Sequence, residues 1–122
     1  MTRVALIGVF GAAGALTRLG ISNAIDTRTF PWATLLINVT GSFALGLLLT
    51  WGATRLSHDV GSALAIGFLG AYTTYSTFAV DVTILGDDGR VTAAGLYLAA
   101  TVVLGIAAAA VGVALGRTLV DA

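Results

Sequence analysis

The sequence predicts an all-α integral membrane protein, built as a single transmembrane domain of four helices over residues 1–122. Of its residues, 57% are hydrophobic and only 10% are charged, whereas a soluble domain carries roughly 25% charged residues. The charged residues gather in short clusters, and the apolar stretches between them reach the roughly 20 residues that a helix needs to cross a bilayer. Many of the 16 glycines recur at helical spacings, which favours close helix packing in lipid. We therefore expect a multi-pass protein of the cell membrane, surrounded by lipid.

The charge clusters place the four helices at about residues 4–25, 31–54, 60–86 and 91–117. Pro31 stands at the start of the second helix, where a proline is well tolerated. The basic Arg3, the apolar run after it and Ala13-Gly14-Ala15 also fit a cleavable signal peptide. Cleavage would leave little but further spans, so we expect residues 4–25 to be the first span.

The third helix is predicted to be interrupted. The uncharged run from Val60 to Val80 contains the hexad Thr73-Thr74-Tyr75-Ser76-Thr77-Phe78, which follows Gly67 and Gly70. Glycine and hydroxyl residues have poor helix propensity. An interruption frees backbone carbonyls and amides, which membrane proteins tolerate only against protein or a watery path. Freed carbonyls would suit a small, hard cation.

Arginine counts give almost no preference for one orientation in the membrane. Four spans put both termini and the loop between the second and third helices on one side, with Arg3, Arg55 and Arg117. The opposite side carries Arg28 and Arg90, plus Arg18 if the first helix ends there. Because excess positive charge normally stays on the cytoplasmic side, this balance predicts dual topology and an antiparallel dimer. The alternative is a single orientation that other factors determine.

Composition excludes several function classes. The chain has no cysteine, its basic residues are all arginine and its acids are all aspartate, so neither a thiolate metal site nor a nucleic-acid partner is expected. His58 is the single histidine, and one loop histidine does not make a metal site. No nucleophile–base pair, phosphate loop or cofactor motif is present. We expect that the protein is not an enzyme.

Several polar or aromatic side chains inside the spans are candidates for function. Asn38 offers amide donors at membrane depth, or it joins two helices by a hydrogen bond. Tyr75 and Phe78 share a helix face at a spacing of three, or form an ordinary aromatic pair. Arg18 could concentrate anions at a pore mouth or reach to the interface. On the fourth helix, Tyr97 and Thr101 lie one turn apart.

Three function classes fit these residues. A passive anion channel would use amide and hydroxyl donors together with aromatic ring edges, which carry partial positive charge. A small proton-coupled multidrug exporter of four helices would need a carboxylate deep in the membrane, and Asp81 lies late in the third span. An assembly subunit of a larger complex would not need the hexad. Flux through the purified protein would separate the last class from the others, and a requirement for a pH gradient would separate the first two.

Three motifs resemble the Fluc (CrcB) family of fluoride channels over nearly the whole chain. They are Gly11-Ala12-Ala13-Gly14-Ala15-Leu16-Thr17-Arg18, Thr34-Leu35-Leu36-Ile37-Asn38-Val39-Thr40-Gly41-Ser42-Phe43, and Gly67-Phe68-Leu69-Gly70-Ala71-Tyr72 followed by the hexad. The resemblance implies an antiparallel, dual-topology dimer that exports fluoride passively through two parallel pathways. It also implies a structural Na⁺ on the two-fold axis, held by the backbone carbonyls of Gly70 and Thr73.

The resemblance further implies roles for individual side chains. Asn38 would be a pore-lining donor, and Arg18 would lie at the vestibule. Tyr75 and Phe78 occupy the positions of two pore phenylalanines, so Tyr75 adds a hydroxyl to that ring pair. Ser76 and Thr77, with Tyr97 and Thr101, match a polar track beside the rings. That track is shortened at Gly105 and Ala109, where other members often continue it. Since some family members assemble from two different subunits, a heterodimer with a paralogous subunit stands beside the expected homodimer.

Overall fold

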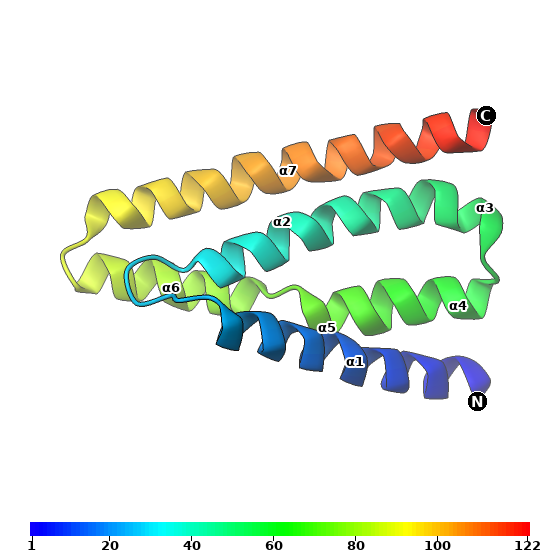
Figure 1. The fold of residues 1–122 in the computed structure, drawn as a ribbon, viewed down its shortest axis with the longest axis horizontal. Coiled ribbons are helices and arrows are strands. Elements are labelled where there is room, and N and C mark those ends of the chain that lie inside the picture. The colour runs from blue at the N-terminus through cyan, green and yellow to red at the C-terminus, as the bar shows by residue number, and fades with distance from the viewer.

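The structure is a computed structural model that describes residues 1–122, and its regular elements are all helices. Four helical stretches are long and apolar enough to cross a membrane, namely Thr2–Ala24, Trp32–Arg55, His58–Asp87 and Val91–Asp121. They run up and down beside one another, and both termini lie at the same end (Figure 1). The all-α fold with four spans is therefore confirmed. The fourth helix continues past its predicted end near residue 117, because neither glycine nor proline follows Gly116.

Three of the four spans are helical throughout. The first is α1 (Thr2–Ala24), and the fourth is α7 (Val91–Asp121). The second consists of α2 (Trp32–Leu47), the π-helical segment η1 (Leu48–Gly52) and α3 (Ala53–Arg55). It begins directly after Pro31, as the sequence predicts.

The third span has four helical pieces: α4 (His58–Ser62), the π-helical η2 (Ala63–Leu69), α5 (Gly70–Tyr72) and α6 (Tyr75–Asp87). The two residues between α5 and α6 have extended backbone, with φ −80° and ψ 158° at Thr73 and φ −152° and ψ 114° at Thr74. Thr74 then caps α6, because its hydroxyl oxygen accepts from the Thr77 N–H. These two residues lie roughly midway along the bundle (Figure 1).

Glycines bring the helix backbones into direct contact. A methyl group at Gly14 of α1 would overlap the carbonyl of Phe68 in η2, and one at Gly112 of α7 would overlap the carbonyl of Phe43 in α2. Lipid provides little hydrophobic drive for helices to associate, so close backbone approach and dispersion contacts replace it. The helix pairs α1–η2 and α2–α7 accordingly have the most extensive contacts in the bundle.

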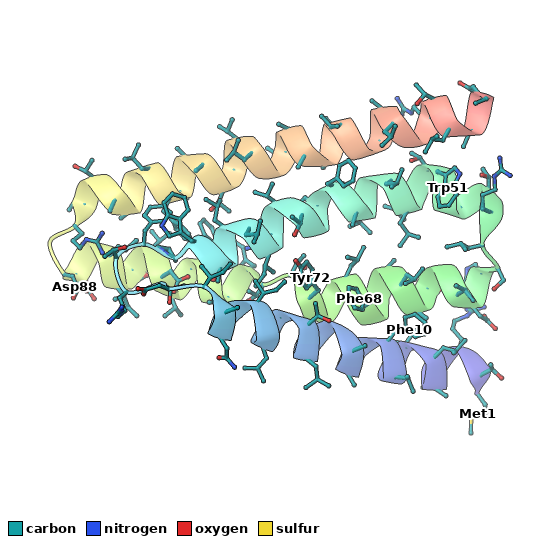
Figure 2. The ribbon with its side chains drawn as sticks, in the orientation of Figure 1. Met1, Phe10, Trp51, Phe68, Tyr72 and Asp88 are labelled. Atoms are coloured by element: carbon teal, nitrogen blue, oxygen red, sulfur yellow. The ribbon has the colours of Figure 1, made fainter.

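The buried core is small, as expected for a chain whose outer surface faces lipid. Only 20 of 122 residues are buried. One cluster joins Leu35, Phe78, Leu85, Ala94 and Tyr97, and the other joins Ile37, Leu69 and Tyr72. The rings of Phe68 and Tyr72 stack with centroids 5.9 Å apart beside the second cluster (Figure 2).

The two ends of the bundle carry similar positive charge. Arg3, Arg55 and Arg117 lie at the end that holds the termini, and Arg28 and Arg90 lie at the opposite end. Arg3 pairs with Asp59 at 2.8 Å and so joins α1 to α4. Arg28 pairs with Asp26 at 2.8 Å in the first loop, and this guanidinium lowers the pKa of the Asp26 carboxyl.

Candidate functional site

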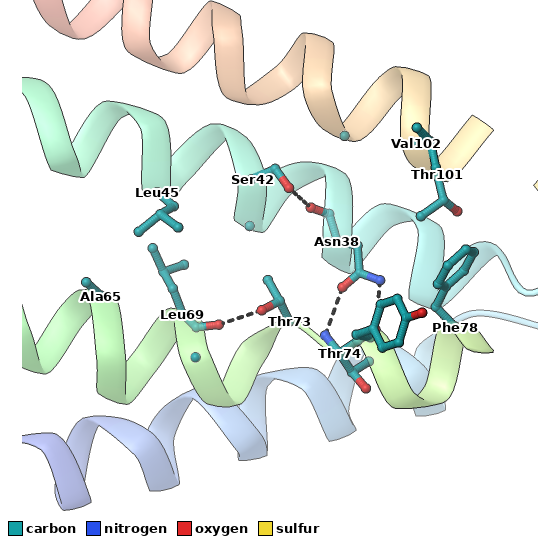
Figure 3. Close-up of a pocket in the computed structure, with 14 residues that line it drawn as sticks. Asn38, Ser42, Leu45, Ala65, Leu69, Thr73, Thr74, Phe78, Thr101 and Val102 are labelled. Carbon is teal, nitrogen blue, oxygen red and sulfur yellow. Dashed lines mark hydrogen bonds between the residues drawn. The ribbon is translucent and has the colours of Figure 1, made fainter. Parts of the chain in front are cut away.

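A hollow of about 410 Å³ lies where the third span loses its helical form (Figure 3). Its walls come from α2, η2, α5, α6 and α7, so all but the first span contribute. The polar members are Asn38, Ser42, Thr73, Thr74 and Thr101, and the aromatic members are Tyr75 and Phe78. Tyr75 is 79% exposed in the single chain. The hollow is therefore open on the outer side of the bundle at membrane depth.

Asn38 holds the non-helical residues in place. Its Nδ2 donates to the carbonyl of Thr74 at 3.0 Å, and its Oδ1 accepts from the N–H of Thr74 at 2.8 Å. The bond to Oδ1 gives the Thr74 N–H the partner that it would otherwise have in a continuous helix. An asparagine amide carries two N–H donors, so one donor of Asn38 remains for another partner.

The contacts of Thr74 release two particular carbonyl groups. In a continuous helix, the N–H of Thr74 would donate to Gly70 and the N–H of Thr77 would donate to Thr73. Here the Thr74 N–H donates to Asn38, and the Thr77 N–H donates to the hydroxyl oxygen of Thr74 at 3.1 Å. Gly70 and Thr73 thus lose their helical donors, and both residues border the hollow. Backbone carbonyls that lack donors are suitable ligands for a hard cation.

Three aromatic rings form a row beside the hollow. Tyr75 and Phe78 meet edge to face, with centroids 5.9 Å apart and planes at 63°. Phe78 in turn lies 5.3 Å from the ring of Tyr97. Exposure falls along the row from 79% at Tyr75 to 8% at Phe78 and 0% at Tyr97. The row therefore runs from the outer surface into the bundle, and its ring edges offer partial positive charge.

Thr101 presents a hydroxyl that nothing in the chain satisfies. Its Oγ1 is buried and has no hydrogen-bond partner, although Thr101 borders the hollow. Buried polar atoms without partners are rare in native structures and call for an explanation. Ser42 borders the same space and donates to the carbonyl of Asn38 at 2.7 Å. Because this oxygen has almost no accessible surface, a ligand in the hollow would meet it only after the Thr101 side chain rotates.

Arg18 borders a separate, smaller hollow of about 200 Å³ on the side of α1. Thr77 and Thr34 also border it, and Thr74 borders both hollows. Neither salt bridge of the chain involves Arg18, so its charge is available to an anion. Several predicted site residues thus line one of two separate hollows, and Thr74 lines both.

Other predicted residues lie beside the larger hollow rather than in its lining. Ser76 and Thr77 form the first turn of α6, and both of their hydroxyls are within hydrogen-bond distance of the Thr74 hydroxyl, at 3.3 Å and 3.1 Å. Tyr97 is fully buried, and its hydroxyl donates to Asp81 at 3.2 Å. Asp81 therefore contacts Tyr97 and makes no salt bridge with Arg18.

Sequence reasoning named Thr74 only within the hexad and Ser42 only within a motif, and it gave neither residue a role of its own in this site. Threonine is a preferred helix N-cap, so the pattern of Thr74 before a new helical run could have located the start of α6. Ser42 follows Asn38 by one helical turn, which places both on the same face of α2. Neither signal identifies a site residue until the position of the neighbouring helix is known.

Comparisons with known proteins give a consistent result. The family model described as CrcB-like protein, Camphor Resistance (CrcB), matches residues 5–113. A fluoride-specific ion channel FluC from Trichormus variabilis is 41% identical, over 86% of this chain and 81% of that protein. The proteins of the same name from Geobacter sulfurreducens and Agrobacterium fabrum are 37% and 38% identical over 98% of this chain, and they are covered over 100% and 99% of their own lengths.

Proposed function

The chain belongs to the CrcB family, and on that premise we propose that it is a fluoride channel through which the ion leaves the cytoplasm down its electrochemical gradient. Export of this kind limits fluoride toxicity. The relatives are named as fluoride-specific ion channels, and a channel is a transporter rather than an enzyme. The four spans make the protein a multi-pass membrane protein.

The polar hollow that opens on the outer side of the bundle is the observation that carries this proposal. A single chain would leave the partly buried Asn38 and Thr73 open towards hydrocarbon. Polar groups at that depth are costly unless protein or a watery path meets them. A second copy that covers the hollow would turn it into an enclosed path. The similar charge at the two ends favours an antiparallel, dual-topology pair.

The donors around the hollow suit a small, strongly hydrated anion. Fluoride must lose part of its hydration shell to enter, so the path has to replace water with hydrogen-bond donors. The second N–H of Asn38 would supply one of them, and the unpartnered hydroxyl of Thr101 would supply another after its side chain turns towards the hollow. The edges of Tyr75 and Phe78 add partial positive charge, and Arg18 would raise the anion concentration at the entrance. Ser76, Thr77 and Tyr97 complete the polar wall beside this path.

The released carbonyls of Gly70 and Thr73 would hold a structural Na⁺ between two copies. One chain provides two oxygen ligands, and a two-fold partner would provide two more. The donor set fits the ion, because Na⁺ binds backbone oxygens and the two carbonyls have lost the N–H groups that would compete for them. The ion would neutralise carbonyl dipoles that otherwise face each other where the two copies meet, and so stabilise the dimer.

The proton-coupled exporter fits the structure less well. Such a protein needs a carboxylate in the transport path, and Asp81 instead accepts a hydrogen bond from the buried Tyr97. Asp81 also lies outside the lining of the larger hollow. A fluoride channel therefore accounts for more of the polar groups at membrane depth.

Fluoride efflux from liposomes that contain only this purified chain tests the proposal. We expect efflux to begin when a potassium ionophore balances the charge that leaves with fluoride, and to need no pH gradient. Efflux that occurs only with a pH gradient would favour the exporter. A well-folded chain that conducts only after a paralogous subunit is added would replace the homodimer with a heterodimer.

A further inference from the structure

Apart from the two polar hollows, the bundle has a purely apolar groove between α2–η1 and η2, here called the outer groove. Its nine lining residues are all hydrophobic, and its volume is about 450 Å³. Phe43, Leu47 and Trp51 form one wall, and Leu64 and Phe68 form the other. It shares only Leu69 with the polar hollow. The proposed fluoride path therefore makes no use of the outer groove.

The lining and depth of the outer groove favour a hydrocarbon chain as its occupant. Its walls are apolar throughout, and its volume of about 450 Å³ is ample for a flexible acyl chain. Both walls belong to membrane-spanning helices, so acyl chains are the surrounding solvent at this depth.

One end of the outer groove has the chemistry of a lipid headgroup site. Trp51 and Leu56 both line the groove, and Arg55 lies one turn after Trp51 and directly before Leu56. Trp51 is 37% exposed, and tryptophan is typical of the membrane interface. Arg55 is exposed and takes part in neither salt bridge of the chain. An unpaired guanidinium next to an interfacial tryptophan matches a phosphate in charge and in hydrogen-bond geometry.

We propose that the outer groove binds one anionic phospholipid, with an acyl chain between Phe43 and Phe68 and the phosphate at Arg55. This binding does not depend on fluoride conduction. One arginine near the membrane surface favours anionic over zwitterionic lipid by about fivefold. The expected signature is therefore a headgroup preference of that size, confined to the lipid that contacts Trp51.

Quenching of tryptophan by lipids with brominated acyl chains tests this site directly. The chain has two tryptophans, so Trp32→Phe leaves Trp51 as the only reporter. We expect brominated phosphatidylglycerol to compete for Trp51 about five times better than brominated phosphatidylcholine. Arg55→Gln should reduce that ratio to about one. The Trp51→Phe protein retains Trp32 at the opposite end, where both lipids should quench equally.

A second arginine at the same membrane end provides the matched control. Arg117→Gln removes the same charge from α7, outside the lining of the groove, and should leave the ratio near five. Equal quenching of Trp51 by the two lipids would overturn the proposal. So would a loss of preference in Arg117→Gln as large as that in Arg55→Gln, because general surface charge would then explain it. Protection of Trp51 from both lipids would instead show that a second copy covers the groove.

Discussion

Replacing Asn38 by aspartate should block fluoride almost completely. The carboxylate can still accept from the Thr74 N–H, which Asn38 Oδ1 now does at 2.8 Å, but it loses the bond that Nδ2 donates to the Thr74 carbonyl at 3.0 Å. Two unit charges about 4 Å apart repel by about 4 kcal/mol at an effective dielectric constant of about 20. Since 1.36 kcal/mol corresponds to a factor of ten in rate, passage should fall by about a thousandfold.

Asn38→Ala separates this charge effect from loss of structure. Alanine removes both bonds to Thr74, at 3.0 and 2.8 Å, and leaves a buried N–H unpaired at a cost of about 1–3 kcal/mol. We expect a lower melting temperature for the alanine protein but faster passage per folded protein than with aspartate. Efflux measured with a fluoride electrode, normalised to protein that elutes as folded dimer, gives both rates. Equal rates for the two variants would refute the charge argument.

Four other predictions address the aromatic row, the helix packing, the orientation and the ion. Phe78→Ile should cut efflux strongly while the dimer survives, because it removes a ring edge; unchanged efflux would exclude Phe78 from the path. Gly14→Ala should destabilise the fold by about 1–3 kcal/mol, because its methyl group would overlap the Phe68 carbonyl. Gly8→Ala is the control and should not destabilise it, because a methyl group there meets nothing within 4 Å. Equal melting temperatures of the two variants in detergent would contradict the close α1–η2 contact. Two lysines added at the N-terminal side should bias insertion and impair fluoride resistance in cells, whereas full resistance would argue against dual topology. Replacing external Na⁺ should leave efflux unchanged during the assay, and a rapid, reversible loss would contradict a buried structural ion.

Much of the fold follows from the order of residues alone. Membrane spans depend on the length and hydropathy of local segments, and the bilayer selects helices because their backbone bonds are internal. Four spans, short loops and the start after Pro31 were therefore predictable. The hexad also indicated a weak point in the third span, because poor helix propensity is a local property. The end of α7 was placed too early, since a charged residue such as Arg117 does not by itself stop a helix.

The composition of the site could be predicted only in part. Asn38, Tyr75, Phe78 and Thr101 do border one hollow, because the packing of the helices brings these positions to the same level of the bundle. Sequence spacing did not indicate that Arg18 would border a different space, or that Tyr97 would contact Asp81. Those outcomes depend on how far each helix rotates about its axis. That rotation depends on which glycines meet which backbones across the bundle.

The sequence by itself determined that this chain crosses the membrane four times, with nearly equal positive charge at its two ends and a segment of poor helix propensity in its third span. Only the tertiary structure decided where that segment opens and which groups it releases. The reason is that Asn38 reaches Thr74 from 36 positions away in the chain and takes the N–H that would otherwise pair with Gly70. A bond between two helices, not a local preference, selects the carbonyls and donors that remain available at membrane depth.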